Sequence, residues 1–316
     1  MRNRRYAIIG TGAVGGFYGG RLARAGRDVH FLLHGDFDHV RRHGLRVESV
    51  EGDFTLPNVQ AYARAADLPP SDVVVLALKT TQNHLLPELL PPAIAREGVV
   101  LVLQNGFGVE EEAAAVVGPD RVMGCLCFLC SNKVGPGHIQ HLDYGFVTLA
   151  EFSADGRPRG VTDRMRAVAA DFEAAGIEVK LAEDLLLARW RKLVWNVPFN
   201  ALSVVLDAGV DEVMADAHAR RLAEELMGEV VAAAGKCGRS IADDFVQHML
   251  ELTERMKPYR TSMKIDCDLR RPMEIEAIFG NPLRAARRAG ADCPRMETLY
   301  RQLKFIDARN RAAATS

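Results

Sequence analysis

The 316-residue sequence has little net charge, few cysteines and no long hydrophobic run. Its 40 lysines and arginines nearly cancel 41 aspartates and glutamates, whereas a dedicated nucleic-acid binder usually carries a basic excess. Six cysteines are too sparse for a disulfide scaffold in a chain of this size. No apolar run reaches the roughly 18 residues of a membrane helix, and Tyr6–Ile9 is too short for a signal peptide. We therefore expect a cytoplasmic protein that binds neither nucleic acid nor membrane.

Lysine is also scarce, because eight of the 40 basic residues are lysines and the other 32 are arginines. An arginine guanidinium stays charged in proteins, whereas a lysine ammonium can give up its proton. Each lysine is therefore a candidate for proton transfer, and Lys79 and Lys192 fall within motifs described below.

No metal site is expected from the sequence. Cys125, Cys127 and Cys130 form a cluster, but a fourth ligand at short spacing is missing, so these residues read as small apolar side chains on a buried strand. The nine histidines show no ligand spacing either.

The two halves of the sequence follow different patterns. Up to residue 183, continuous apolar strands alternate with helical stretches, which is typical of a parallel sheet covered on both faces. Beyond it, apolar residues recur at a spacing of three to four, which predicts helices. The expected fold class is α/β, with a Rossmann-type doubly wound parallel sheet over residues 1–183 and an all-helical domain over residues 184–316. Strands are expected at 6–9, 28–33, 73–78, 99–103 and 177–180, an antiparallel hairpin within 122–149, and helices at 13–25, 85–96, 110–117, 161–175, 185–206, 211–234, 243–256, 273–289 and 295–308.

A glycine-rich motif follows the first expected strand and begins the first helix. It has the pattern G-x-G-x-x-G and consists of Gly10, Thr11, Gly12, Ala13, Val14 and Gly15. Its glycines allow a tight turn, a close approach of the backbone to a pyrophosphate, and close packing of helix on sheet. The helix N-terminus adds free N–H groups and a positive dipole end. This context predicts dinucleotide binding.

The end of the second expected strand indicates which dinucleotide is bound. An NAD enzyme usually has an acidic residue there for the ribose 2′-hydroxyl, but this chain has His34, with Asp36 two residues later. Arg41 and Arg42 follow, and together these residues favour the 2′-phosphate of NADP. Two alternatives stay open: Asp36 could turn towards the ribose, and the arginine pair could be solvated surface.

Polar residues also follow the next two strands. Lys79 comes directly after the strand at 73–78, and Gln104 and Asn105 follow the strand at 99–103. Because ligands in open α/β sheets bind beyond the carboxyl ends of the strands, we expect Lys79 and Asn105 to lie with His34 and the glycine-rich turn.

One helix of the second half carries a polar face among apolar neighbours. Lys192, Asn196 and Asn200 are spaced four residues apart and therefore share this face. Their burial would need partners or a ligand, because an unpaired buried polar group is costly. A satisfied network between helices is as good an explanation as a binding site. Pro198 lies between the two asparagines and is expected to kink the helix.

At this point the sequence resembles the ketopantoate reductase (2-dehydropantoate 2-reductase) family over nearly its whole length. The resemblance rests on the glycine-rich motif, Leu78-Lys79, Leu103–Gly106, the Lys192–Asn200 helix, Thr261–Asp266, and Glu274–Glu276 with Gly280 beyond. It implies a Rossmann domain followed by a helical domain, and the NADPH-dependent reduction of 2-dehydropantoate, a small 2-oxo acid, in pantothenate biosynthesis.

The resemblance also implies roles for individual residues. Lys192 is the general acid that neutralises the developing alkoxide, and burial would lower its pKa and make it a better donor. Glu274 orients this lysine or holds a substrate hydroxyl, and Lys79 lies near the cofactor. The substrate is bound by Asn105, Asn196, Asn200 and Ser262. Without the resemblance, Glu274 and Ser262 would be read as surface pairing and helix capping.

The sequence departs from the family pattern at three places. His34 stands where arginine is common, Tyr259 where some members have asparagine, and Arg270–Pro272 where a Gly-Arg pair is common. The first departure weakens the assignment to NADP, and Tyr259 would change the pocket. Two other functions therefore stay open: a reductase of another branched or aromatic 2-oxo acid, and a non-catalytic NADP-binding sensor. The retention of Lys192 and Glu274 argues against the sensor, and a homodimer is compatible with the sequence.

Overall fold

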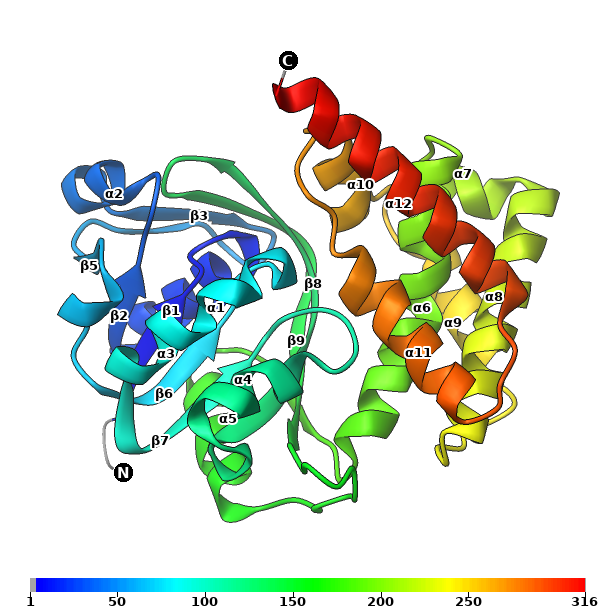
Figure 1. The fold of residues 1–316 in the computed structure, drawn as a ribbon. Coiled ribbons are helices and arrows are strands. Elements are labelled where there is room, and N and C mark those ends of the chain that lie inside the picture. Colours follow the sequence, from blue (N-terminus) through cyan, green and yellow to red (C-terminus); the bar gives the residue numbers. More distant parts are fainter. Residues whose placement is uncertain (1–3, 316) are drawn as a thin grey trace. The chain divides into compact units, whose positions relative to one another are not determined.

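The computed structural model describes residues 4–315 and divides into two compact units (Figure 1). The first comprises Met1–Asn105 and Val109–Leu185, and the second comprises Gly106–Gly108 and Leu186–Ser316. Within the described residues, no helix combines the length and the apolar character that a bilayer crossing needs.

The first unit is built around one 10-stranded sheet. The strands β5, β2, β1, β6, β7 and β8 lie side by side in that order and run parallel. This is the order 3-2-1-4-5-6 of a dinucleotide-binding fold, which confirms the expected fold class. The strands are β1 (Arg5–Ile9), β2 (Asp28–Leu32), β3 (Leu45–Ser49), β4 (Phe54–Leu56), β5 (Gln60–Tyr62), β6 (Ser71–Leu76), β7 (Ile94–Val102), β8 (Val122–Gly135), β9 (His138–Glu151) and β10 (Val179–Leu181).

The central strands are apolar over most of their length because both faces of the sheet are covered. Residues Tyr6–Ile9 of β1 and Val74–Leu76 of β6 are fully buried. The covering helices are α1 (Ala13–Arg24), α2 (Phe37–His43), α3 (Leu86–Ala93), α4 (Val109–Val117) and α5 (Asp163–Ala174). The expected helix at 85–96 is shorter than predicted, because β7 already begins at Ile94.

The expected antiparallel hairpin is confirmed and extends one side of the sheet. β8 and β9 pair antiparallel along most of their length, and β9 in turn pairs in parallel with β3 and β10. Cys125, Cys127 and Cys130 are free and buried on β8, as expected of apolar strand residues.

The second unit is helical. It contains α6 (Leu185–Val205) from Leu186 onward, with α7 (Val210–Ala215), α8 (Ala217–Lys236), α9 (Phe245–Glu254), α10 (Ser262–Asp268), α11 (Asn281–Arg288) and α12 (Pro294–Thr315). Its core includes the buried α6 residues Trp190, Leu193, Val194, Val197 and Phe199. The helix runs on through Pro198, where a kink was expected.

Two expected helices of this unit are interrupted. Residues 211–234 form two helices, because Asp216 has an extended backbone and its side chain accepts from the amides of His218 and Ala219 at the start of α8. Within residues 273–289, a π-helical turn at Glu276–Gly280 precedes α11. Periodicity alone hides both interruptions, because apolar residues recur across them.

Candidate active site

The glycine-rich turn is shaped by its first and third glycines. Gly10 has φ +96°, and a Cβ there would stand 2.5 Å from the Leu78 nitrogen. A Cβ on Gly15 would stand 2.3 Å from the Gly10 oxygen. Both positions therefore require glycine, and the turn lies directly against the chain that follows β6.

The middle glycine faces open space. A Cβ on Gly12 would meet no described atom within 4 Å, although Gly12 is the N-cap of α1. The first turn of α1 has no capping side chain, so its leading N–H groups point towards this space. An uncapped helix start beside open space fits the pyrophosphate of a dinucleotide.

The loop after β2 lies beside this turn. Thr11 ties the two together, because its hydroxyl donates to the carbonyl oxygen of Leu32 at 3.0 Å. His34 is exposed, as are Arg41 and Arg42 on α2. Asp36 is buried, and one carboxylate oxygen lies 2.6 Å from Lys133 Nζ and accepts from the Gly137 amide at 3.0 Å. Asp36 is therefore engaged within the protein rather than turned towards a ribose.

Lys79 and Asn105 follow two neighbouring parallel strands. The register pairs Leu76 of β6 with Val102 of β7, so both residues emerge at the same edge of the sheet. Beneath them, the buried Gln104 side-chain amide donates to the Leu78 carbonyl at 3.0 Å and to Asn83 Oδ1 at 2.6 Å. Lys79 itself is exposed and precedes the 3₁₀ turn Thr80–Leu85.

The second unit contains the polar face of α6. Lys192 and Asn196 are each 8% exposed and Asn200 is 3% exposed, so all three are buried. Asn200 Nδ2 donates to the Asn196 carbonyl oxygen at 2.9 Å. Asn200 Oδ1 is buried and has no hydrogen-bond partner among the described residues. The described residues therefore do not satisfy every polar atom of this face.

Ser262 is connected to this face through two hydroxyl groups. The Ser203 hydroxyl donates to the Asn200 carbonyl oxygen at 3.2 Å and lies 2.8 Å from the Thr261 hydroxyl. Thr261 is the N-cap of α10, where its side chain accepts from the Lys264 amide, and Ser262 is the first residue of that helix. Ser262 is half-buried and does not cap the helix.

Glu274 lies in the segment that leads into the π-helical turn. It is 6% exposed, so it is no surface carboxylate, and its carbonyl oxygen accepts from the Ile278 amide. Both Glu274 and Lys192 have interaction partners in the structure. Tyr259 is half-buried against the helical core. Arg271 is held locally by an ion pair with Asp266 at 2.9 Å.

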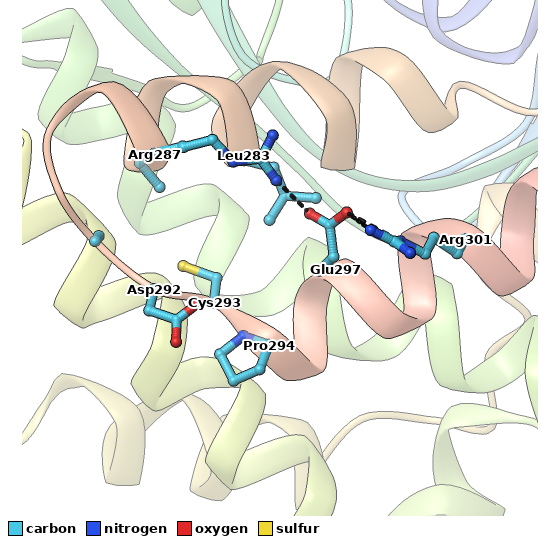
Figure 2. A pocket seen from close by; sticks show the side chains of 9 residues that line it. Leu283, Arg287, Asp292, Cys293, Pro294, Glu297 and Arg301 are labelled. Carbon is cyan, nitrogen blue, oxygen red and sulfur yellow. Dashed lines mark hydrogen bonds and ion pairs between the residues drawn. The ribbon is translucent and has the colours of Figure 1, made fainter.

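A separate hollow of about 300 Å³ in the second unit contains none of these residues (Figure 2). It lies between α11 and the start of α12. Two arginines line the hollow, and both form ion pairs with Glu297: Arg287 at 3.0 Å and Arg301 at 2.9 Å. Their charges are therefore already paired within the protein. It is lined by Leu283, Ala286, Arg287, Ala291, Asp292, Cys293, Pro294, Glu297 and Arg301.

Sequence reasoning missed several residues whose hydrogen bonds hold the predicted site residues or their neighbours in place. Lys133 reaches the glycine-rich turn from β8, and the Gln104–Asn83 and Ser203–Thr261 pairs buttress the expected ligand-binding residues. The only sequence signal was the scarcity of lysine, which marked Lys133 as one of eight. No group of histidine, cysteine or acidic residues within the described part of the chain could hold a metal ion.

Comparisons with known proteins show the family to which the chain belongs. Residues 6–154 match the family model "Ketopantoate reductase PanE/ApbA", and residues 184–307 match "Ketopantoate reductase PanE/ApbA C terminal". A 2-dehydropantoate 2-reductase from Nostoc sp. is 59% identical over 311 residues, which cover 98% of each chain.

Solved structures show the same fold. The crystal structure of 2-dehydropantoate 2-reductase from Geobacter metallireducens matches with a TM-score of 0.91 at 43% identity, over 95% of this chain and 99% of that one. D-mandelate dehydrogenase with NADH and anilino(oxo)acetate matches with a TM-score of 0.86 over 97% and 99% of the two chains, but its 19% identity shows only the fold. The chain, which contains both the glycine-rich turn and the polar face of α6, is therefore an oxidoreductase that belongs to the ketopantoate reductase family.

Proposed function

We propose that this chain reduces 2-dehydropantoate to pantoate with NADPH. The observation that carries the proposal is the polar face of α6, where a lysine and two asparagines are buried in an apolar core and one asparagine oxygen lacks a partner. A small polar substrate would supply that partner. The dinucleotide-binding part would comprise residues 1–183 and the substrate part residues 184–316.

The cofactor would be held by the glycine-rich turn. Gly12 leaves space for the pyrophosphate, and the amides at the start of α1 offer it hydrogen bonds. His34 would lie near the 2′-phosphate, and Lys79 and Asn105 near the nicotinamide end, because they follow the strands on the other side of β1. NADPH supplies the hydride that reduces the carbonyl carbon.

The residues of the helical unit would manage the charge that this reduction creates. Lys192 would donate a proton from Nζ to the carbonyl oxygen, which otherwise would become an alkoxide. Glu274 would orient the lysine or accept from a substrate hydroxyl. The carboxylate and hydroxyl of the substrate would be bound by Asn105, Asn196, Asn200 and Ser262.

Oxidation of NADPH, followed by its absorbance, tests the proposal. Purified protein should consume NADPH in the presence of 2-dehydropantoate, with a higher kcat/KM than for other 2-oxo acids and than with NADH. Turnover of a different 2-oxo acid, without turnover of 2-dehydropantoate, would contradict the proposed substrate. Tight NADPH binding without any turnover would favour a non-catalytic sensor. Light scattering after size-exclusion chromatography tests the homodimer.

A second substrate class is favoured by one observation. Tyr259 lies three residues before Ser262 and packs against the helical core, at a position where the family resemblance places an asparagine in some members. The alternative is therefore a reductase of another branched or aromatic 2-oxo acid. Comparing kcat/KM for 2-dehydropantoate and phenylpyruvate in the wild type and in Tyr259→Asn separates the two substrates.

A further inference from the structure

Lys133 connects three segments that lie far apart in the sequence. Its Nζ lies 2.6 Å from a carboxylate oxygen of Asp36, beyond β2, and donates to the carbonyl oxygen of Thr11 in the glycine-rich turn at 3.4 Å. Lys133 itself comes from the far end of β8. All three residues belong to the first unit, so these contacts are internal to it.

This position is where dinucleotide-binding folds distinguish their cofactors. An acidic residue beyond the second strand normally binds the ribose 2′-hydroxyl of NAD. Asp36 is the acidic residue nearest to that position in the sequence, but Lys133 and the Gly137 amide both bind its carboxylate. An unbalanced carboxylate here would accept from a ribose diol and repel a 2′-phosphate. With Lys133 beside it, the pair carries no net charge.

The ammonium group also has capacity to spare. A lysine has three N–H donors, and the contacts with Asp36 and Thr11 use two of them. The Lys133 side chain is 33% exposed, whereas that of Asp36 is 9% exposed. The side of the pair that is open to a ligand is therefore the cationic one.

We propose that Lys133 is a specificity residue for the cofactor: it holds Asp36 away from the ribose and offers its remaining N–H to the 2′-phosphate of NADPH. This rests on the proposed NADPH-dependent reduction. It gives the chain a phosphate ligand on a different strand from the usual one, which accounts for the histidine at position 34.

The charge state of Asp36 agrees with this role. Burial raises the pKa of its carboxyl group, but the Lys133 ammonium and the Gly137 amide together lower it by more. The pKa therefore lies below its ordinary value. Asp36 is therefore ionised at neutral pH. Without Lys133, a negative charge would face the phosphate.

Binding measurements with Lys133→Met test the proposal without relying on turnover. Methionine keeps an unbranched side chain of similar length and removes the charge. Titration calorimetry with 2′-AMP and 5′-AMP, and with NADPH and NADH, should show a loss of about tenfold or more for 2′-AMP and NADPH, because a charge-assisted hydrogen bond is lost. The affinities for 5′-AMP and NADH should stay the same or rise.

Three further variants make the result specific. Lys133→Arg should retain most of the preference for NADPH. Adding Asp36→Asn to Lys133→Met should restore part of the NADPH affinity, because it removes the repelling charge. Lys180→Met, on β10, is the matched control for the loss of one surface lysine and should bind both cofactors as the wild type does.

The outcomes separate this proposal from the proposed function. An equal loss for NADPH and NADH in Lys133→Met, or no loss for either, overturns the role of Lys133 and leaves the reductase function intact. A wild-type protein that binds and uses NADH better than NADPH also overturns it. A wild-type protein that reduces no 2-oxo acid with either cofactor contradicts the proposed function instead, while the 2′-AMP titrations still decide the role of Lys133.

Discussion

Asn200 donates its side-chain N–H to the carbonyl oxygen of Asn196, one helical turn earlier, at 2.9 Å. The bond fixes the Asn200 amide, so that its Oδ1 stays buried without a described partner. An unpaired buried acceptor costs about 1–3 kcal/mol of stability. A cost of this size is expected where a ligand supplies the missing donor.

Replacing Asn200 with leucine should therefore separate stability from substrate binding. The variant removes the unpaired oxygen with little change in volume, so its free energy of unfolding should equal or exceed that of the wild type. The KM for the 2-oxo acid should rise by about tenfold or more, since a bond to the substrate is lost. Urea unfolding and steady-state kinetics measure the two effects. A less stable variant with an unchanged KM would mean that Asn200 is purely structural.

Lys192→Ala should lower kcat and leave NADPH binding intact. General acid catalysis contributes about 10²–10⁴-fold, and kcat should fall within that range. The exposed Lys236 on α8 is a matched control, and Lys236→Ala should retain the wild-type kcat. Stopped-flow kinetics at saturating substrate give the comparison. A Lys192→Ala variant with normal turnover would remove this lysine from the mechanism.

Two alanine substitutions in the glycine-rich turn should have different effects. Gly12→Ala places its methyl group in open space, so the protein should fold with a nearly unchanged Tm but bind NADPH at least about tenfold more weakly. Gly10→Ala forces a positive φ on alanine and a contact with the Leu78 backbone, which should cost about 1–3 kcal/mol or more. Thermal unfolding with and without NADPH distinguishes them. Equal destabilisation by both would contradict the open space at Gly12.

The Cys130 thiol should make stability fall in alkaline solution. Burial, with a smaller effect of Asp143, raises the Cys130 pKa from 9.0 to about 12. A raised pKa favours the protonated form in the fold, so this contribution is present below about pH 9 and is lost as the pH rises towards 12. The expected slope is up to about 1.4 kcal/mol per pH unit.

Urea unfolding of the wild type and Cys130→Ala between about pH 8 and about pH 10.5 isolates this effect, because the thiol of the unfolded chain titrates in that range. The difference in unfolding free energy between the two proteins should shrink as the pH rises. Parallel curves would indicate that Cys130 ionises as readily in the fold as in the unfolded chain.

The strands around the glycine-rich turn were predictable because their sequence is strongly constrained. Buried parallel strands must be apolar along their length, which made Tyr6–Ile9 and the following strands recognisable. The glycines at positions 10 and 15 were equally easy to recognise as a motif, since no other residue fits there. The short strands β3, β4 and β5 and the helices α2 and α10 were not predicted, because they are too brief for a periodic signal.

The sequence was enough to propose candidate site residues, but it did not show the side chains that hold them in place. Polar side chains at helical spacing in an apolar segment were the signal that singled out Lys192, Asn196 and Asn200. The partnership of Asp36 with Lys133 spans almost a hundred residues and depends on how the β8–β9 hairpin joins the sheet. No local sequence pattern predicts how the hairpin pairs with the rest of the sheet. The sequence alone therefore could not exclude that Asp36 binds a ribose.

The short excursion Gly106–Gly108 means that the chain passes between the two units three times: after Asn105, after Gly108 and after Leu185. Within the second unit, the Phe107 amide donates to the Ala277 carbonyl oxygen, and the Phe107 ring packs on Trp190. A single cut near residue 185 would therefore separate Phe107 from Ala277 and Trp190, the residues that it contacts within the second unit. An exchange of the second unit between relatives would therefore have to include Gly106–Gly108 as well as the residues from Leu186 onward.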